Sequence, residues 1–229
     1  MKYNHCVLKL TFNYPLKRDV KAKDLRGAVA RLYPEERLLH HHRNDGKVEY
    51  YHPLVQYKII NNEYLITGFK EGAELLANLD LVGKRIFFGN RIYTILNKEI
   101  DLYNICFGNI EAQQSYHFLT PWLALNEKNY EKYQKYGTWA KQKELLEKIL
   151  IGNIISMSKS LGYTVPEPVK VNIGNMKEVQ TKLKSTPMLG FLGTFSVNFE
   201  IPDYWGIGKS VSRGFGTIKR VKGVNSVKG

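Results

Sequence analysis

Cysteine is scarce in this sequence. Only Cys6 and Cys106 occur among the 229 residues, and they stand far apart along the chain. A disulfide framework or a zinc knuckle needs cysteines in closely spaced sets. Both are therefore excluded, and we expect a protein of a reducing compartment, the cytoplasm.

Long apolar runs are also missing. The sequence has no uncharged apolar stretch of the roughly 18 residues that a membrane-spanning helix requires. Residues 1–10 lack the apolar segment and the small-residue cleavage site of a signal peptide. We therefore expect a soluble, unexported protein that does not associate with membranes.

Acidic residues are outnumbered by basic ones. Lys and Arg total 34 against 21 for Asp and Glu, so the formal charge is +13 and the pI is about 9.5. Residues 205–229 contain no acidic residue. The cations there are Lys209, Arg213, Lys219, Arg220, Lys222 and Lys228. Such a segment favours a polyanionic partner, because a phosphate backbone neutralises it and releases counterions. A charged surface that only maintains solubility is the alternative.

Hydrophobic periodicity divides the first half into strands and helices. We expect a strand over residues 5–12, a helix over 22–33, strands over 48–60 and 63–67, a helix over 70–79 and a hairpin over 85–96. Turn signals at Asn61-Asn62 and Gly89-Asn90 support the two hairpins. The order is β-α-β-β-α-β, the ferredoxin-like unit. One sheet face of such a unit is exposed, and RNA-recognition modules stack bases on it.

The second half repeats a similar pattern. We expect a strand over residues 113–119, a long helix over 138–161, and strands over 169–173, 188–201 and 215–221. The prediction is an α+β protein of two tandem ferredoxin-like units. The first domain would span residues 1–98 and the second residues 99–229.

A glycine-rich segment follows the strand expected over residues 188–201. Its glycines permit positive φ and close approach of another backbone. The residues that we expect to bind are Gly206, Gly208, Lys209, Ser210, Ser212, Arg213, Gly214 and Gly216. Main-chain N–H groups freed in such a loop, together with its two cations, can hold phosphate oxygens. A tight hairpin without a ligand is the alternative.

Several motifs resemble a known family. Residues 190–195 (GFLGTF), 205–208 (WGIG) and 212–216 (SRGFG) resemble the C-terminal signature of CRISPR-associated endoribonucleases that process repeat RNA. Residues 24–28 (DLRGA) and a His-x-His at residues 40–42 resemble one branch of that family. The resemblance implies two tandem ferredoxin-like folds and metal-independent cleavage of CRISPR repeat RNA, with no cofactor. Other subunits of a CRISPR complex and a homodimer are left open.

The consecutive histidines His40, His41 and His42 follow the first expected helix. Imidazoles titrate near neutral pH, so one can accept a proton while another donates one. In RNA, deprotonation of a 2′-OH lets its oxygen attack the adjacent phosphorus, and protonation of the 5′ oxygen lets that oxygen leave. The products would be a 2′,3′-cyclic phosphate and a 5′-OH. In an extended stretch His40 and His42 project to the same side, and we predict these two to be catalytic.

The family branch also has a basic residue on the preceding helix and a tyrosine on the following strand. Here the basic residue is Arg31 or Arg26, and the tyrosine is Tyr50 or Tyr51. Neighbouring tyrosines alternate across a strand, so only one of them can face the site. We favour Tyr50 and Arg31 for catalysis and count Arg26 among the RNA-binding residues.

Other interpretations of the histidines compete with this one. They could form an incidental polar loop, or His40, His42 and Asp45 could ligate a divalent ion. His5, His52 and His117 are scattered in the sequence, and we expect them to be structural. The alternative function is a non-catalytic RNA-binding subunit of the same fold.

Overall fold

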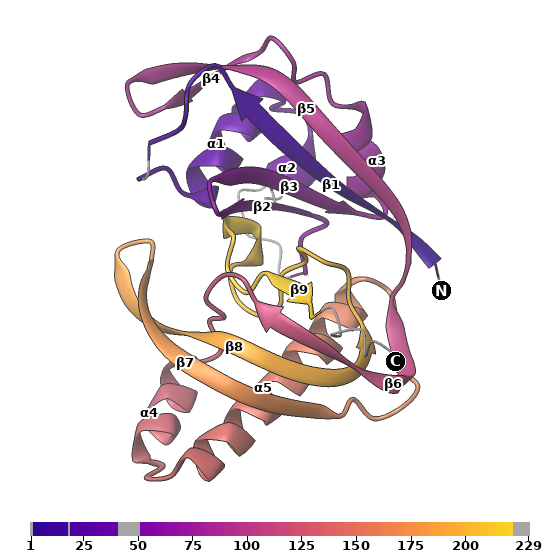
Figure 1. The fold of residues 1–229 in the computed structure, drawn as a ribbon, viewed down its shortest axis with the longest axis vertical. Coiled ribbons are helices and arrows are strands. Elements are labelled where there is room, and N and C mark those ends of the chain that lie inside the picture. Colours follow the sequence, from indigo (N-terminus) through magenta and orange to yellow (C-terminus); the bar gives the residue numbers. More distant parts are fainter. Residues whose placement is uncertain (1, 18, 41–50, 222–229) are drawn as a thin grey trace, which may run out of the picture.

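The chain forms two antiparallel sheets, one from each half of the sequence (Figure 1). The computed structural model describes residues 2–17, 19–40 and 51–221. The first sheet has the order β2-β3-β1-β5-β4, and the second has the order β7-β8-β6-β9. The strands are β1 (Lys2–Phe12), β2 (Val55–Ile60), β3 (Glu63–Phe69), β4 (Arg85–Phe88), β5 (Arg91–Cys106), β6 (Gly108–Phe118), β7 (Val171–Leu183), β8 (Thr186–Glu200) and β9 (Ile218–Arg220).

Helices cover one face of each sheet. They are α1 (Ala22–Leu32), α2 (Arg37–His40) and α3 (Glu71–Asn78) in the first half, and α4 (Glu127–Lys135) and α5 (Trp139–Ser160) in the second. A short 3₁₀ helix, η1 (Val211–Arg213), lies in the glycine-rich segment. Within the described residues, no helix combines the length and the apolar character that crossing a membrane requires.

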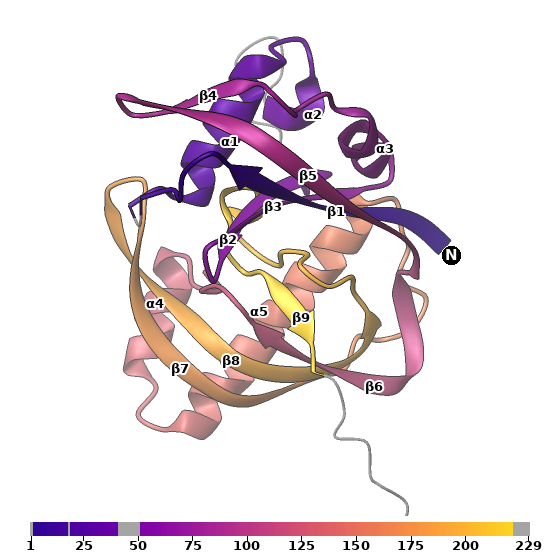
Figure 2. The same ribbon diagram turned by 45° about the horizontal axis from the view of Figure 1, so that its top comes forward.

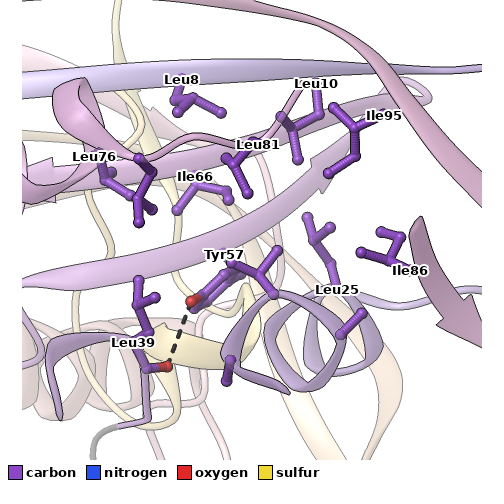
Figure 3. Packing of buried hydrophobic residues seen from close by; sticks show 14 of the residues in the cluster. Leu8, Leu10, Leu25, Leu39, Tyr57, Ile66, Leu76, Leu81, Ile86 and Ile95 are labelled. Atoms are coloured by element: carbon purple, nitrogen blue, oxygen red, sulfur yellow. Dashed lines mark hydrogen bonds between the residues drawn. The ribbon is translucent and has the colours of Figure 1, made fainter. Parts of the chain in front are cut away.

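The core of the first unit lies between its sheet and α1, α2 and α3 (Figure 3). Leu8 and Leu10 of β1 point toward the helices, where they meet Leu25 of α1 and Leu76 of α3. Alternation along the strand and a period near 3.6 along the helix bring these apolar side chains together. The first unit therefore has a complete core of its own.

The opposite face of the first sheet is covered by the second unit. His5 of β1, on that face, lies edge-on to Trp205 of the glycine-rich segment, with ring centroids 6.1 Å apart. Phe69 of β3 lies 5.5 Å from the same Trp205 ring. The expectation of an exposed sheet face for stacking bases is therefore wrong for this part of the sheet, because the second unit occupies it.

The prediction of two tandem ferredoxin-like units in an α+β protein is confirmed. In each sheet the unit's third strand lies between its second and first strands, and its last strand pairs with the other side of the first. The second unit departs from the pattern at one place: the connection from β8 to β9 contains η1 and no α-helix. The glycine-rich segment takes the place of that helix and lies between the two sheets (Figure 2).

Several elements differ from the expected ones. β2 begins at Val55, later than the strand predicted over 48–60, because Pro53 has no N–H to donate to a neighbouring strand. β5 continues through residues 98 and 99 to Cys106, and the chain enters the second sheet at Gly108. The helix α4 was not predicted at all; its first turn is capped by the Asn126 side chain, which accepts from the Asn129 N–H at 2.8 Å.

Burial of His5 predicts that stability depends on pH. The side chain is 2% exposed, and desolvation lowers its pKa from 6.5 to about 4. Between these values the unfolded chain binds a proton that the folded chain does not, so stability rises with pH across this window and falls on acidification. Relative to His5→Phe, the wild-type protein should lose about 3 kcal/mol of unfolding free energy between pH 7 and pH 4.

Urea unfolding of both proteins at the two pH values measures this difference. His117→Phe is the control, because His117 lies on β6 and no pKa shift of His5 depends on it. A wild-type protein and a His5→Phe variant that lose equal stability on acidification would contradict the assignment.

Candidate functional site

A groove of about 1310 Å³ runs between the two units. The first unit contributes Arg26 of α1 and residues 51–53, which precede β2. The second unit contributes one side of α5, the β7–β8 hairpin and residues 208–213 of the glycine-rich segment. The groove therefore exists only because the two units pack together.

Positive charge dominates the lining of the groove. Its cations are Arg26, Lys128, Lys184, Lys209 and Arg213, and Glu127 is the single carboxylate among the described lining residues. A concave surface lined by one sign of charge concentrates ligands of the opposite sign. The groove is therefore suited to an extended polyanion.

Two buried side chains of β2 hold the glycine-rich segment in place. The Gln56 Oε1 accepts hydrogen bonds from the Gly206 N–H at 2.9 Å and from the Lys58 Nζ at 2.8 Å. Lys58 Nζ also donates to the Val211 carbonyl at 3.2 Å. Both side chains are 0% exposed, and burial lowers the pKa of Lys58 well below its usual value. These bonds connect the first unit to the backbone just before the groove-lining turn, at Gly206, and within it, at Val211.

The glycines of this segment face protein rather than open space. A Cβ on Gly214, whose φ is +90°, would lie 2.7 Å from the Ala22 Cβ of α1. A Cβ on Gly216 would lie 2.0 Å from the Ile207 carbonyl oxygen. Gly206, Gly214 and Gly216 are not among the groove-lining residues, whereas Gly208, Lys209, Ser210, Ser212 and Arg213 are. The close approach that we expected of these glycines is therefore made by the protein's own backbone and side chains.

Arg26 joins three parts of the site. Its Nη1 donates to the Ser212 Oγ at 3.2 Å, and its Nη2 donates to the His40 carbonyl. Burial lowers the pKa of Arg26 from its ordinary value, and the charge of Arg213 acts in the same direction. Both guanidinium groups line the groove, where a bound anion would stabilise them.

Arg31 lies elsewhere. Its Nη2 donates to the Phe87 carbonyl at 3.1 Å, and it lines a separate hollow between α1 and the β4–β5 turn. It does not line the groove that Arg26 lines. Of the two arginines that the sequence left open, Arg26 is the one next to His40 and the glycine-rich segment.

The predicted histidine site is described in part. His40 ends α2, and its Nε2 lies 3.1 Å from the Tyr33 carbonyl oxygen. Because a carbonyl only accepts, this nitrogen carries a proton, and the lone pair of the neutral ring is on Nδ1. His42 and Tyr50 lie outside the described residues. Tyr51, the alternative tyrosine, lines the groove.

Sequence reasoning missed several residues of the groove. His52 was expected to be only structural, yet it lines the groove, and its Nε2 lies 3.0 Å from the Gln56 Nε2. Gln56 and Lys58, which do not line the groove but hold the glycine-rich segment beside it, were not predicted as site residues. A charged residue within a predicted buried strand was the available signal, because a buried lysine needs acceptors and so predicts a polar contact.

Comparison with known proteins identifies the family. The model of the Cas6b N-terminal domain matches residues 2–105, and the model of the Cas6b C-terminal domain matches residues 108–221. The chain belongs to the Cas6b family. The two matched ranges coincide with the two units of the fold, and the groove is the junction of the two Cas6b domains.

Solved structures agree with this assignment. A crystal structure of Cas6b is 39% identical, has a TM-score of 0.86 and covers 96% of this chain and 100% of that one. A CRISPR RNA processing endoribonuclease Cas6b is 37% identical, with a TM-score of 0.76 and the same coverage. The uncharacterized protein MJ0978 of Methanocaldococcus jannaschii is 47% identical over 131 residues, which cover 57% of this chain and 88% of that protein. Csf5, a type IV Cas6 crRNA endonuclease, is 12% identical with a TM-score of 0.56 and shares the fold.

The packing of the glycine-rich segment of this Cas6b chain can be tested with two glycines of similar φ. Gly214 has φ +90° and Gly83 has φ +81°, but a Cβ on Gly83 would meet nothing within 4 Å. Gly83→Ala should therefore cost only the left-handed backbone strain, about 1–2 kcal/mol. Gly214→Ala should cost a further 1–3 kcal/mol, roughly, because the methyl group also collides with Ala22. Urea unfolding measures both values, and equal losses would show that the collision is relieved without cost.

Proposed function

We propose that the protein is a metal-independent endoribonuclease that cleaves CRISPR precursor RNA within the repeat. In this reaction the 2′ oxygen attacks the adjacent phosphorus and the 5′ oxygen leaves, which yields a 2′,3′-cyclic phosphate and a 5′-OH. The observation that carries the proposal is Arg26: it binds the backbone of His40 and the hydroxyl of Ser212 at the edge of a basic groove. Membership of the Cas6b family supports RNA as the polyanion.

The proposed chemistry needs one group that takes the 2′-OH proton and another that protonates the leaving 5′ oxygen. We assign these two tasks to His40 and His42, without ordering them. If His40 is the base, it acts through Nδ1, because its Nε2 donates to the Tyr33 carbonyl. Tyr50 is proposed to assist. Two observations on described residues support the assignment: Arg26 binds the carbonyl of His40, and Tyr51 lines the groove.

In this proposal Arg26 stabilises the charge on the phosphate, as the catalytic arginine in place of Arg31. A cation near the reacting phosphate stabilises the negative charge that develops on its oxygens. Arg26 lies between the His40 carbonyl and Ser212, whereas Arg31 donates to Phe87 in another hollow. Ser210, Ser212, Lys209, Arg213 and Gly208 are proposed to hold the RNA backbone along the same wall, and Gly206, Gly214 and Gly216 to shape it.

Cleavage assays test the chemistry directly. Purified protein should cut repeat RNA in EDTA and release 2′,3′-cyclic phosphate and 5′-OH ends, and a single 2′-deoxy substitution at the cleaved nucleotide should abolish the reaction. His40→Ala and His42→Ala should each slow single-turnover cleavage by about 10²–10⁴-fold, the usual value of a lost general acid or base. His117→Ala on β6 is the control and should cut at the wild-type rate.

Two results would overturn this assignment. Cleavage that requires a divalent ion, or that leaves a 3′-OH, would exclude attack by the 2′-OH. Binding of repeat RNA without cleavage under any condition would favour the non-catalytic RNA-binding subunit.

Salt dependence tests the basic wall of the groove, the side that carries Arg26, Lys209 and Arg213. Each phosphate contact of a single strand contributes about −0.7 to the slope of log affinity against log salt. Lys209→Ala and Arg213→Ala should each weaken RNA binding and make that slope shallower by about one contact, with little change in the rate at saturating protein. Arg85→Ala, which removes an exposed arginine of β4 outside the groove, should change neither quantity. Fluorescence anisotropy at several salt concentrations measures the slopes, and identical slopes for all three variants would remove Lys209 and Arg213 from the RNA contact.

A further inference from the structure

The wall of the groove formed by α5 differs in chemistry from the basic wall. Asn153, Ser156 and Ser160 of α5 line it, at spacings that place them on one side of the helix. These side chains are polar and uncharged. In complexes with nucleic acids, an asparagine amide or a serine hydroxyl can hydrogen-bond to the edge of a base.

The orientation of the Asn153 amide is set by a hydrogen bond from a buried tryptophan. The indole Nε1 of Trp122 donates to the Asn153 Oδ1 at 3.0 Å. Trp122 is fully buried and its indole nitrogen can only donate, so the oxygen end of the amide must face it. The Asn153 Nδ2 makes no hydrogen bond within the described residues and is the end left for a ligand.

Gly208 allows the glycine-rich segment to lie directly against Trp122 and Asn153. A Cβ on Gly208 would lie 2.8 Å from the Trp122 Nε1 and 2.9 Å from the Asn153 Oδ1. Any larger residue would therefore push the turn away from this pair. Lys209, the next residue, is exposed and lines the groove. Lys209, a cation that can bind a phosphate, and the oriented amide of Asn153 therefore lie near each other.

We propose that Asn153 is a specificity-determining residue, which reads one base of the RNA as a pure hydrogen-bond donor. The inference rests on the proposed function and deepens it. Paired recognition of adenine by asparagine needs both the amide oxygen and the amide nitrogen directed at the base. Here the oxygen is turned toward Trp122, so the amide nitrogen favours the carbonyl oxygen at C4 of uracil or C6 of guanine and disfavours the amino group that cytosine or adenine carries at the same position.

Asn153→Asp inverts this chemistry while it keeps an acceptor for Trp122. One carboxylate oxygen can accept from the indole and the other presents an acceptor to the groove. Ser156→Asp is the matched control, because it adds the same charge to the same wall one turn away. The probe is repeat RNA with a 2′-deoxy substitution at the cleaved nucleotide, together with a panel that carries single U→C or G→A changes. Anisotropy gives the affinity of each protein for each RNA.

The expected result is a change of base preference in one variant only. Asn153→Asp should bind the native repeat about tenfold more weakly than Ser156→Asp does, and one U→C or G→A change should restore about tenfold. Ser156→Asp should weaken binding to all RNAs of the panel by the same factor. If both variants lose affinity equally across the panel, Asn153 acts only through charge and the inference is wrong.

A second variant tests the orientation without adding charge. Trp122→Phe removes the indole N–H, so the Asn153 amide is free to rotate. Discrimination against the amino-bearing bases should then fall several-fold, while cleavage of the native repeat continues. Unchanged discrimination would overturn the inference. Failure of the wild-type protein to bind repeat RNA would instead overturn the proposed function, so the two failures are distinguishable.

Discussion

The functional groove depends on one buried polar junction between the units. The ammonium of Lys58 and the amide of Gln56 lie on β2 with no exposure to solvent, and both bind the backbone or each other at the glycine-rich segment. Removing the amino group of a lysine from water is costly unless acceptors replace the water, and burial also lowers its pKa. The Val211 carbonyl and the Gln56 Oε1 are those acceptors. The glycine-rich segment must therefore lie against β2 for the buried Lys58 side chain to have its hydrogen bonds.

This junction explains why the β8–β9 connection of the second unit contains no α-helix. A ferredoxin-like unit usually connects its last two strands through a helix, but here the β8–β9 connection is the glycine-rich segment and η1. The interior N–H groups of an α-helix are used within the helix, whereas the Gly206 N–H of this segment is available to the Gln56 Oε1. Small residues allow the segment to approach α1 and β2 closely, and its remaining cations, Lys209 and Arg213, reach the groove.

The groove has two walls of different chemistry. The α1 and glycine-rich side carries guanidinium and ammonium groups, and the α5 side carries an amide and hydroxyls. In the proposed function, an RNA strand with its backbone against the first wall would present its bases to the second. Affinity and sequence preference are thereby assigned to different side chains, which is the usual division in protein–nucleic acid recognition.

The sequence by itself determined the fold class, the two units and most strand and helix positions, because alternation, helical spacing and turn residues are local properties. Its net charge favoured a polyanionic partner. The sequence also supplied the motifs that resemble the family. α4 was missed, because Tyr133 is its one buried residue and an almost wholly polar helix has no clear apolar face.

Only the tertiary structure decided which arginine lies at the groove. Arg26 and Arg31 are both on α1, and nothing in their spacing shows which side of the helix meets the second unit. The structure also decided that Gly214 packs against Ala22 and that Asn153 is oriented by Trp122. These contacts join residues that are far apart in the chain, and their geometry depends on how two separately formed cores pack against each other.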